Sequence, residues 1–367
     1  MIAQPVSPEL QAEALLDQTL AEIASFFPMT QADYDMLSYG QQVYGVRMTE
    51  GKGRQQITVI KGASGNHYIG SHSEQEEMEA RRDRDLQFFD SWYDGLQHLS
   101  TKGKQPERVA QVVTQRWPKR AKRSKKLRVL SPNSVARQQY IQFSPGALFI
   151  VELNGKLVKL PIEALYPWEY YSRTLPPVLA EQTLEWDFRK EVAECIRRMI
   201  LGVSALFPIT AEDQALIDLA NAQIRIKFVD HFWQLASAFV TESGKYRVGF
   251  PRDDMEEQPV GIQHDTKTGR ANADAEVGAI RKARRLYPGD PMKTVVTVHH
   301  ATKNHTHEDG ELIRIVTSCA LCRKSLLHYS PNVKNIIPLN GEGIGKVPMR
   351  VLYPLPDFPV PGLAVAA

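Results

Sequence analysis

The sequence predicts an α/β protein of two tandem, three-layer domains, each with a mixed sheet of about five strands flanked by helices. Three observations lead to this prediction: a length of 367 residues, an alternation of strand-like and helix-like segments, and an internal repeat. Such alternation requires crossover connections, so part of each sheet should be parallel. We place the domains at 1–178 and 179–367, with Pro176-Pro177 as the linker.

The two halves of the chain carry the same residues in the same order. Each contains an aromatic residue and a proline followed by a threonine and an aspartate: Phe27-Pro28, Thr30 and Asp33, then Phe207-Pro208, Thr210 and Asp213. The best match runs without a gap from 128–155 onto 314–341, with eight identical residues across 28 positions. The identical pairs are Arg128/Arg314, Arg137/Arg323, Ser144/Ser330, Pro145/Pro331, Ile150/Ile336, Leu153/Leu339, Asn154/Asn340 and Gly155/Gly341. A repeat of this kind indicates two copies of one domain.

Hydrophobic periodicity locates the elements of the first half. We expect helices over 8–27 and 30–44, strands over 57–60 and 67–69, a charged helix over 74–98, a strand over 127–130, a helix over 134–143 and a strand over 147–153. Thr30 has the side chain of an N-cap for the second helix. In the second half, Asp274 opens a helical run that reaches Leu286, and a strand over 312–316 precedes a helix over 325–329.

Composition narrows the class of protein. The net charge of +3 is too small to decide for or against a nucleic-acid partner. No run approaches the roughly 18 apolar residues of a membrane span, and the residues 1–5 lack the basic and apolar regions of a signal peptide. Three cysteines do not make a disulfide framework, so we expect a cytoplasmic protein. Cys195, among apolar neighbours, is predicted to be a core residue of a helix.

Two of the three cysteines, Cys319 and Cys322, form a C-x-x-C motif where a strand-like segment meets a helix-like one. At such a turn both sulfurs project from the first helical turn, where the helix dipole favours thiolate ions. The repeat places Asn133 and Ala136 at the equivalent positions of the first half. Because the scaffold is repeated there without cysteines, the fold does not require them, which favours catalysis or ligand binding. The simpler alternative is a buried pair of cysteines in a helix turn.

A second helix start carries Asp274, Ala275 and Glu276. Zinc accepts sulfur and carboxylate oxygen, and a catalytic zinc keeps three protein ligands and one water. Asp274 and the two cysteines supply three ligands, with Glu276 beside them to handle protons. We therefore predict a zinc site made from two helix N-termini. The alternatives are that Asp274 is an N-cap that binds no metal, and that Glu276 is a first-turn carboxylate favoured by the helix dipole.

These motifs resemble those of the cytidine deaminase superfamily of zinc-dependent enzymes, which carry (His/Cys)-Ala-Glu at one helix start and Pro-Cys-x-x-Cys at another. Here the motifs are Asp274-Ala275-Glu276 and Ser318-Cys319-Ala320-Leu321-Cys322-Arg323. The segments 236–249 and 351–358 are similar to the first hairpin of the family and to a segment near its C-terminus. The resemblance covers about 182–360 directly, and 8–170 through the repeat.

The chain departs from the family pattern at three places. Asp274 stands where the family has His or Cys, and Ser318 replaces the proline before the first cysteine. The segment 250–254 follows the hairpin in place of the ribose-binding Asn-x-Glu of the family. The resemblance to nucleoside deaminases is therefore weakest where the sugar would bind.

The resemblance implies a cytidine-deaminase-like fold in both domains and a hydrolytic deaminase activity in the second. Zn²⁺ would be held by Asp274, Cys319 and Cys322, and Glu276 would pass a proton from the attacking water to the ring nitrogen and then to the leaving ammonia. The substrate would be a cytosine-type or related aminated base, nucleoside or nucleotide, which is converted to its oxo form.

The resemblance also suggests how the rest of the chain contributes. We expect Asn272 and Ser318 to contact the substrate. The first domain, with Asn133 and Ala136 in place of the cysteines, is a degenerate, non-catalytic copy. Duplicated chains of this family form dimers that mimic the tetramers of single-domain members, so the resemblance implies a homodimer without a membrane partner.

Two other functions stay open at this point. One is an inactive deaminase-fold protein that binds a nucleotide or a regulatory partner. The other is editing of RNA or DNA by means of a basic tract at 116–128, whose candidate contacts are Arg116, Lys119, Arg120, Lys122 and Arg123. Such charge runs are more often solvated loops, and we favour the same interpretation for the histidines His299, His300, His305 and His307.

Overall fold

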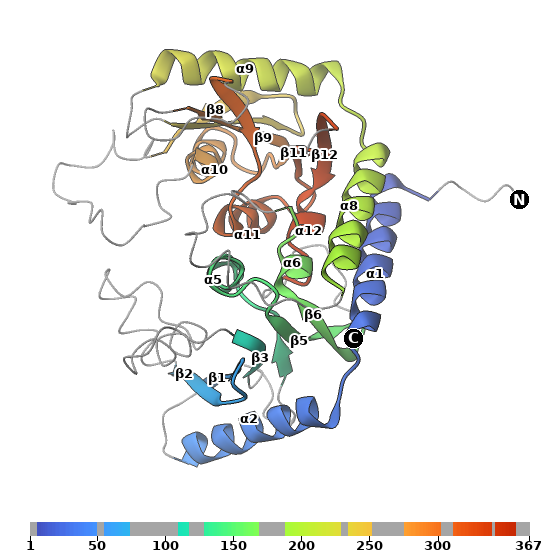
Figure 1. Cartoon of the computed structure of the whole chain (residues 1–367). Coiled ribbons are helices and arrows are strands. Elements are labelled where there is room, and N and C mark those ends of the chain that lie inside the picture. Colours follow the sequence, from blue (N-terminus) through green and yellow to red (C-terminus); the bar gives the residue numbers. More distant parts are fainter. Residues whose placement is uncertain are drawn as a thin grey trace, which may run out of the picture.

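A computed structural model describes residues 6–49, 55–73, 109–116, 128–168, 188–228, 234–251, 275–301, 311–339 and 342–356. The first half forms one mixed sheet with its helices (Figure 1). Its elements are α1 Pro8–Phe26, α2 Gln31–Thr49, β1 Gln55–Gly62, β2 His67–Ser73, β3 Val109–Arg116, β4 Arg128–Leu130, α5 Ser134–Phe143, β5 Leu148–Leu153, β6 Lys156–Pro161 and α6 Ile162–Leu165. The strands lie in the order β2-β1-β3-β5-β6, with β4 paired to β3. The β3–β5 pair is parallel, and the other pairs between described strands are antiparallel.

The second half forms a sheet with the same topology. Its elements are α8 Arg189–Leu206, α9 Ala211–Lys227, β7 Leu235–Thr241, β8 Tyr246–Gly249, α10 Ala275–Leu286, β9 Met292–His300, β10 Ile313–Val316, α11 Ala320–Tyr329, β11 Lys334–Pro338, β12 Ile344–Pro348 and α12 Met349–Leu352. The strands lie in the order β8-β7-β9-β11-β12, with β10 paired to β9 and with β9 and β11 parallel. The predicted α/β class with two mixed sheets is therefore confirmed.

The register of the repeat is also confirmed. Helices α5 and α11 begin at Ser134 and Ala320, and strands β5 and β11 begin at Leu148 and Lys334, which is the spacing of the gap-free match. Strand β3 lies at the centre of its sheet but is not among the predicted segments. The helix predicted over 74–98 and the domain boundary at Pro176-Pro177 lie outside the described residues.

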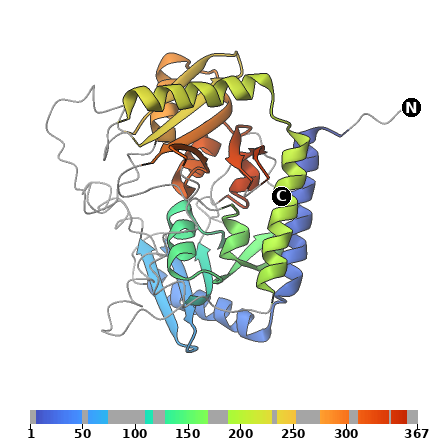
Figure 2. The same ribbon diagram turned by 45° about the horizontal axis from the view of Figure 1, so that its top comes forward.

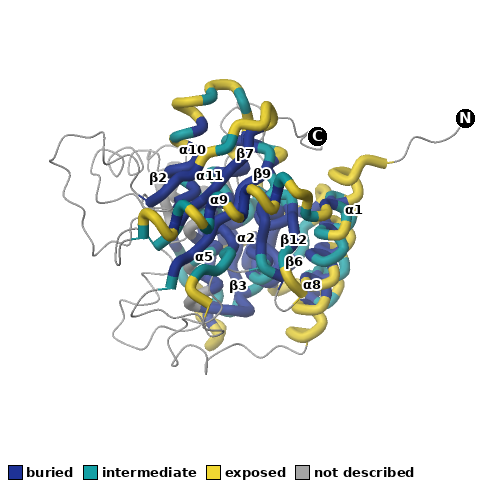
Figure 3. Tube along the Cα trace, turned by 90° about the horizontal axis from the view of Figure 1, so that it is seen from above, coloured by how far each residue is buried: buried dark blue, intermediate teal, exposed yellow. Residues whose placement is uncertain are grey.

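Helices cover both faces of the second sheet. Alternate residues of a strand point to opposite faces, and Val296 of β9 packs with the residues of α9, whereas Val295 packs with those of α10 and α11. Helix α9 contacts β7 and β9, while α10 contacts α11 and the β7–β8 hairpin. Figure 3 shows the buried strands beneath helices whose outer residues are exposed. The starts of α10 and α11, where the motifs lie, are thus on one face of the sheet.

The two halves share one hydrophobic core. The largest cluster of buried residues contains side chains of both halves, from Ala12 to Tyr353. The equivalent helices α1 and α8 pack side by side, as Figure 2 shows, and α5 packs against α11. Cys195 is buried in α8 within this core, as predicted. No helix in the described part of the chain is long and apolar enough to cross a membrane.

Two equivalent, fully buried arginines join the halves. Arg137 donates to the carbonyl oxygen of Leu165 in its own half, and to those of Pro354 and Leu355 in the other half at 2.7 Å each. Arg323 makes the reciprocal set, to Leu352 and Pro167 at 2.7 Å and to Trp168 at 2.5 Å. Each guanidinium also lies over a tyrosine ring of the opposite half, Tyr353 for Arg137 and Tyr166 for Arg323. These charge-assisted hydrogen bonds make each half a structural partner of the other.

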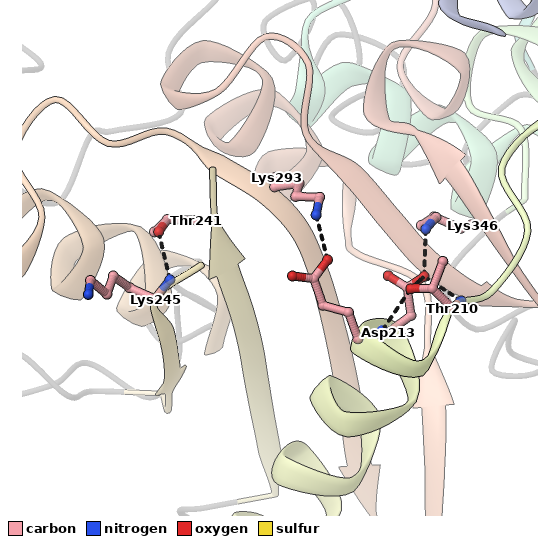
Figure 4. Close-up of polar contacts among 7 residues, drawn as sticks. Thr210, Asp213, Thr241, Lys245, Lys293 and Lys346 are labelled. Carbon is pink, nitrogen blue, oxygen red and sulfur yellow. Dashed lines mark hydrogen bonds and ion pairs between the residues drawn. The ribbon is translucent and has the colours of Figure 1, made fainter. Parts of the chain in front are cut away.

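A buried aspartate–lysine pair is also repeated. Asp213, at the start of α9, accepts hydrogen bonds from Thr210 and lies 2.5 Å from Lys346 Nζ of β12 (Figure 4). Asp33 of α2 makes the same contacts with Thr30 and with Lys159 Nζ, at 2.8 Å. Burial alone would raise the pKa of both carboxyls, but the hydrogen bonds from the lysines and threonines outweigh it and lower each pKa below its usual value.

We predict that Asp213→Asn lowers the free energy of unfolding by about 3–5 kcal/mol near neutral pH, because it leaves Lys346 buried without its counter-ion. Since the pKa of Asp213 is lower in the folded chain, its contribution is present above the unfolded pKa of about 3.9 and is lost as the pH falls through the folded pKa. Urea unfolding across acid pH should show a flatter pH dependence for the variant than for the wild type.

The matched control is the neighbouring pair of Glu212 and Lys293, which are 2.5 Å apart but partly exposed. Lys293→Met should change the free energy of unfolding by less than about 1 kcal/mol, because water screens this pair. Equal losses for the two variants would show that the buried pair does not anchor α9.

Candidate active site

The cysteine pair lies at the N-terminus of α11, as predicted. Cys319 is the N-cap residue, and its Sγ accepts a hydrogen bond from the backbone N–H of Cys322 at 3.3 Å. Both side chains are buried. All three cysteines lie in the described part of the chain, and none of them forms a disulfide. The first turn of α11 therefore presents two thiols from a buried helix start.

Glu276 lies in the first turn of α10 and is only 3% exposed. Helix α10 packs against α11, so the two predicted motifs occupy neighbouring helices on one face of the sheet. A carboxylate at a helix N-terminus is stabilised by the helix dipole. The structure thus brings Glu276 and the cysteine pair to the same layer of the domain.

The remaining predicted site residues fall outside the described part of the chain. Asp274 directly precedes α10, and Asn272 lies two residues earlier, so their positions stay predictions. Among the residues that are described, no group of three or more His, Cys, Asp or Glu side chains is arranged to hold a metal ion. Of the basic tract, the structure places Arg116 at the end of β3, and Lys119, Arg120, Lys122 and Arg123 lie outside the described residues.

Two glycines bring α10 into close contact with the end of β8. A Cβ atom on Gly249 would lie 2.1 Å from the backbone nitrogen of Ala279, and one on Gly278 would lie 2.3 Å from the carbonyl oxygen of Phe250. Only glycine permits such an approach of two backbones. The segment that replaces the ribose-binding motif of the family therefore begins directly against the helix that carries Glu276.

The N-terminal half caps the equivalent helix without cysteines. Asn133 is the N-cap of α5, and its Oδ1 accepts from the backbone N–H of Ala136 at 2.8 Å. This bond is the counterpart of the one between Cys319 Sγ and the Cys322 N–H. Asparagine is among the best N-cap residues. The helix start therefore needs a cap at this position but not a thiol.

A buried polar pair beside Cys319 was not predicted as such. Ser318 and Asn335 of β11 are fully buried, and Asn335 Nδ2 donates to Ser318 Oγ at 2.9 Å. The Asn335 Oδ1 atom is buried and has no hydrogen-bond partner among the described residues. In the gap-free match the equivalents are Pro132 and Phe149, which are apolar. This difference between the two copies is the sequence signal that singles out Asn335.

Two of the four histidines are buried, which corrects the expectation that they are solvated. His299 and His300 are the last residues of β9, where β10 and β7 flank the strand. The His300 ring stacks on Phe228, with centroids 3.7 Å apart, and its Nδ1 lies 2.7 Å from the carbonyl oxygen of Ala301. Strand β9 continues through a segment that was expected to be a polar loop, so both residues lie within the sheet, between β7 and β10. His305 and His307 lie outside the described residues.

No family model matches the chain. Over 149 residues the chain is 26% identical to Blasticidin-S deaminase of Bacillus cereus, a match that covers 41% of this chain and 94% of that protein. It is also similar to the solved cytidine deaminases of Bacillus anthracis (19% identity, TM-score 0.29, 40% of this chain and 88% of that one) and Burkholderia pseudomallei (19%, 0.28, 40% and 99%).

The chain is an α/β protein with two copies of a mixed sheet. In the second copy, the cysteines and Glu276 lie at the starts of the adjacent helices α11 and α10. The match to a deaminase sequence confirms the resemblance to the cytidine deaminase superfamily that the motifs predict. That match spans nearly all of the relative but less than half of this chain, which is the proportion expected when a chain contains two copies of the domain.

We predict that Cys319→Asn leaves the free energy of unfolding of the metal-free chain unchanged or slightly higher, because asparagine caps the equivalent helix α5. Cys319→Ala removes the cap and should cost about 1 kcal/mol. Urea unfolding with a chelator present measures both. If Cys319→Asn destabilises the chain as much as Cys319→Ala, the sulfur has a structural role that capping does not explain.

Proposed function

We propose that this chain is a zinc-dependent hydrolytic deaminase that acts on a cytosine-type or related aminated base, nucleoside or nucleotide. The observation that carries the proposal is the pairing of Glu276, buried in the first turn of α10, with Cys319 and Cys322 at the start of the adjacent helix α11. The similarity to a deaminase sequence supports the same reaction class. The N-terminal half is, on this proposal, a copy without its own chemistry.

The sulfur and carboxylate groups of Cys319, Cys322 and Asp274 are of the types that bind zinc. Thiolates and carboxylates are zinc ligands, and the hydrogen bond from the Cys322 N–H to Cys319 Sγ is of the kind that stabilises a thiolate at a helix start. Cys319, Cys322 and Asp274 would hold the metal, which leaves a fourth position open. When bound, zinc supplies a Lewis acid that activates water at neutral pH.

Glu276 would act as the proton carrier of the reaction. Its carboxylate would accept a proton from the attacking water, deliver it to the ring nitrogen, and then help the amine depart as ammonia. Burial in the first turn of α10 keeps bulk water from competing for this carboxylate. The contact between Gly278 and the Phe250 backbone fixes the helix on which the carboxylate is carried.

Ser318 and Asn272 would contact the substrate. Asn335 Nδ2 donates to Ser318 Oγ, so the hydroxyl proton of Ser318 is directed away from Asn335 and can be donated to a ligand. A buried polar pair costs free energy unless its hydrogen bonds are made. The apolar residues Pro132 and Phe149 fill the equivalent places in the half without cysteines. We infer from this contrast that the Ser318–Asn335 pair serves the reaction.

The family resemblance also leads us to propose that the chain forms a homodimer.

We predict that Glu276→Gln lowers kcat by about 10²–10⁴-fold while zinc content is retained, because it removes a general acid–base but no proposed ligand. Ammonia release should be assayed on cytosine, adenine and guanine bases, nucleosides and nucleotides, with metal content measured in parallel. Wild-type protein should carry about one zinc per chain, since Cys319, Cys322 and Asp274 offer a single site.

Two results would contradict this assignment. One is a wild-type chain that binds no zinc, or binds it equally after Cys322→Ala. The other is turnover that survives Glu276→Gln. Zinc binding without ammonia release from any compound would favour an inactive binding protein, and salt-sensitive binding of polynucleotides in a gel shift would favour nucleic-acid editing.

We predict that the exchange Ser318→Pro with Asn335→Phe, which installs the pair of the N-terminal copy, lowers kcat/KM at least about tenfold, as loss of a substrate hydrogen bond does. Zinc content should stay that of the wild type. The control is Thr58→Val, which removes a buried hydroxyl bonded to Thr114 at 2.7 Å in the other half. Unchanged kcat/KM in the exchanged protein would show that the polar pair only fills space.

A further inference from the structure

We propose that the N-terminal half is a working part of the metal site of the C-terminal half, because Pro167 and Trp168 hold Arg323 and, through it, the C-x-x-C turn. Arg323 is thus a positioning residue that acts on Cys319 and Cys322 without contacting the substrate. This inference rests on the zinc site proposed above.

Arg323 directly follows Cys322 and is fully buried. Its Nε donates to the carbonyl oxygen of Ser318 at 2.8 Å, which ties the residue before Cys319 to the first turn of α11. Its two Nη atoms extend in the other direction, to Leu352 of its own half and to Pro167 and Trp168 of the other. One rigid guanidinium therefore spans the entry to the cysteine motif and the opposite half of the chain.

The Trp168 carbonyl is held toward Arg323 by an uncommon backbone conformation. Trp168 has a φ of 59°, in the left-handed region that non-glycine residues seldom adopt. Its equivalent Leu355 has a φ of 48° and accepts from Arg137 in the same manner. The same strained turn thus occurs twice, each time at the carbonyl that meets the arginine of the other half. Such strain persists only where surrounding contacts enforce it.

The turn at Trp168 makes one hydrogen bond to the half with the cysteines that the turn at Leu355 cannot return. The indole Nε1 of Trp168 donates to the carbonyl oxygen of Pro338, at the end of β11, at 2.5 Å. Leucine at position 355 has no side-chain donor with which to return this contact. Trp168 therefore contacts two elements of the other half: α11, through the hydrogen bond from Arg323 to its carbonyl oxygen, and β11, through its indole N–H.

The contacts form a continuous path to the proposed ligands. Trp168 and Pro167 hold Arg323, and Arg323 holds the Ser318 carbonyl. Cys319 is the next residue along the chain. Groups that orient metal ligands from outside typically change metal affinity about 10–100-fold when they are removed. If the N-terminal half holds Arg323 in this way, it has a role in the metal site although it has no cysteines of its own.

The chain contains its own control for a test of this proposal. Arg137→Lys and Arg323→Lys remove equivalent cross-half hydrogen bonds, but only Arg323 adjoins the cysteine pair. Lysine keeps the charge and loses the fork of donors. We expect Arg323→Lys to weaken zinc binding at least about tenfold and Arg137→Lys to change it less than about twofold. Competition with a chromophoric zinc chelator on the full-length chain measures both, and the melting temperatures should fall by similar amounts.

Trp168→Leu provides a second variant if Arg323→Lys fails to fold. Leucine already adopts this backbone conformation at Leu355, so the turn should form without the indole contact to Pro338. Zinc affinity should fall about threefold or more, with little change for Leu355→Trp. Equal effects of the two lysine variants, or none from Arg323→Lys and Trp168→Leu, would overturn the proposal. A wild-type chain that binds no zinc at Cys319 and Cys322 would instead remove the proposed function on which it rests.

Discussion

The architecture depends on a reciprocal exchange of hydrogen bonds between two buried arginines and the opposite half of the chain. A guanidinium taken out of water must have its donors satisfied, and backbone carbonyls at the ends of α6 and α12 provide the acceptors for Arg137 and Arg323. Each arginine takes acceptors from both halves. The shared core and the contacts of α1 with α8 and of α5 with α11 surround this exchange. The two halves of the chain are therefore packed around one common centre.

Within this symmetric frame the two copies differ where chemistry is proposed. The helix start that Asn133 caps in one copy is capped by Cys319 in the other, and the apolar neighbours Pro132 and Phe149 are replaced by Ser318 and Asn335. Both changes replace a structurally adequate residue by one that binds or orients ligands more readily. Differences between equivalent positions are informative because the common fold has the same requirements at both.

Particular residues show how much could be predicted from the sequence. The repeat, the α/β class and the starts of α5, α10 and α11 follow from spacing and caps, which act locally. The central strand β3 was not predicted, because it adjoins the basic tract and its short apolar run does not stand out beside those charges. The burial of His299 and His300 was not predicted either, because it depends on the pairing of β9 with β7 and β10 and on Phe228, which stacks on the His300 ring. The exchange of Arg137 and Arg323 involves carbonyl groups, which every residue has and which sequence patterns do not distinguish.

The sequence by itself determined that two related domains occur in this chain, and that cysteines and a carboxylate stand at two helix starts of the second domain. Periodicity, capping and motif spacing carry that information because each depends on neighbouring residues. Only the tertiary structure decided that α10 and α11 lie side by side, that Asn335 is bonded to Ser318, and that Trp168 of one half holds Arg323 of the other. These contacts join residues far apart in the chain, so they depend on how the two sheets and their helices pack.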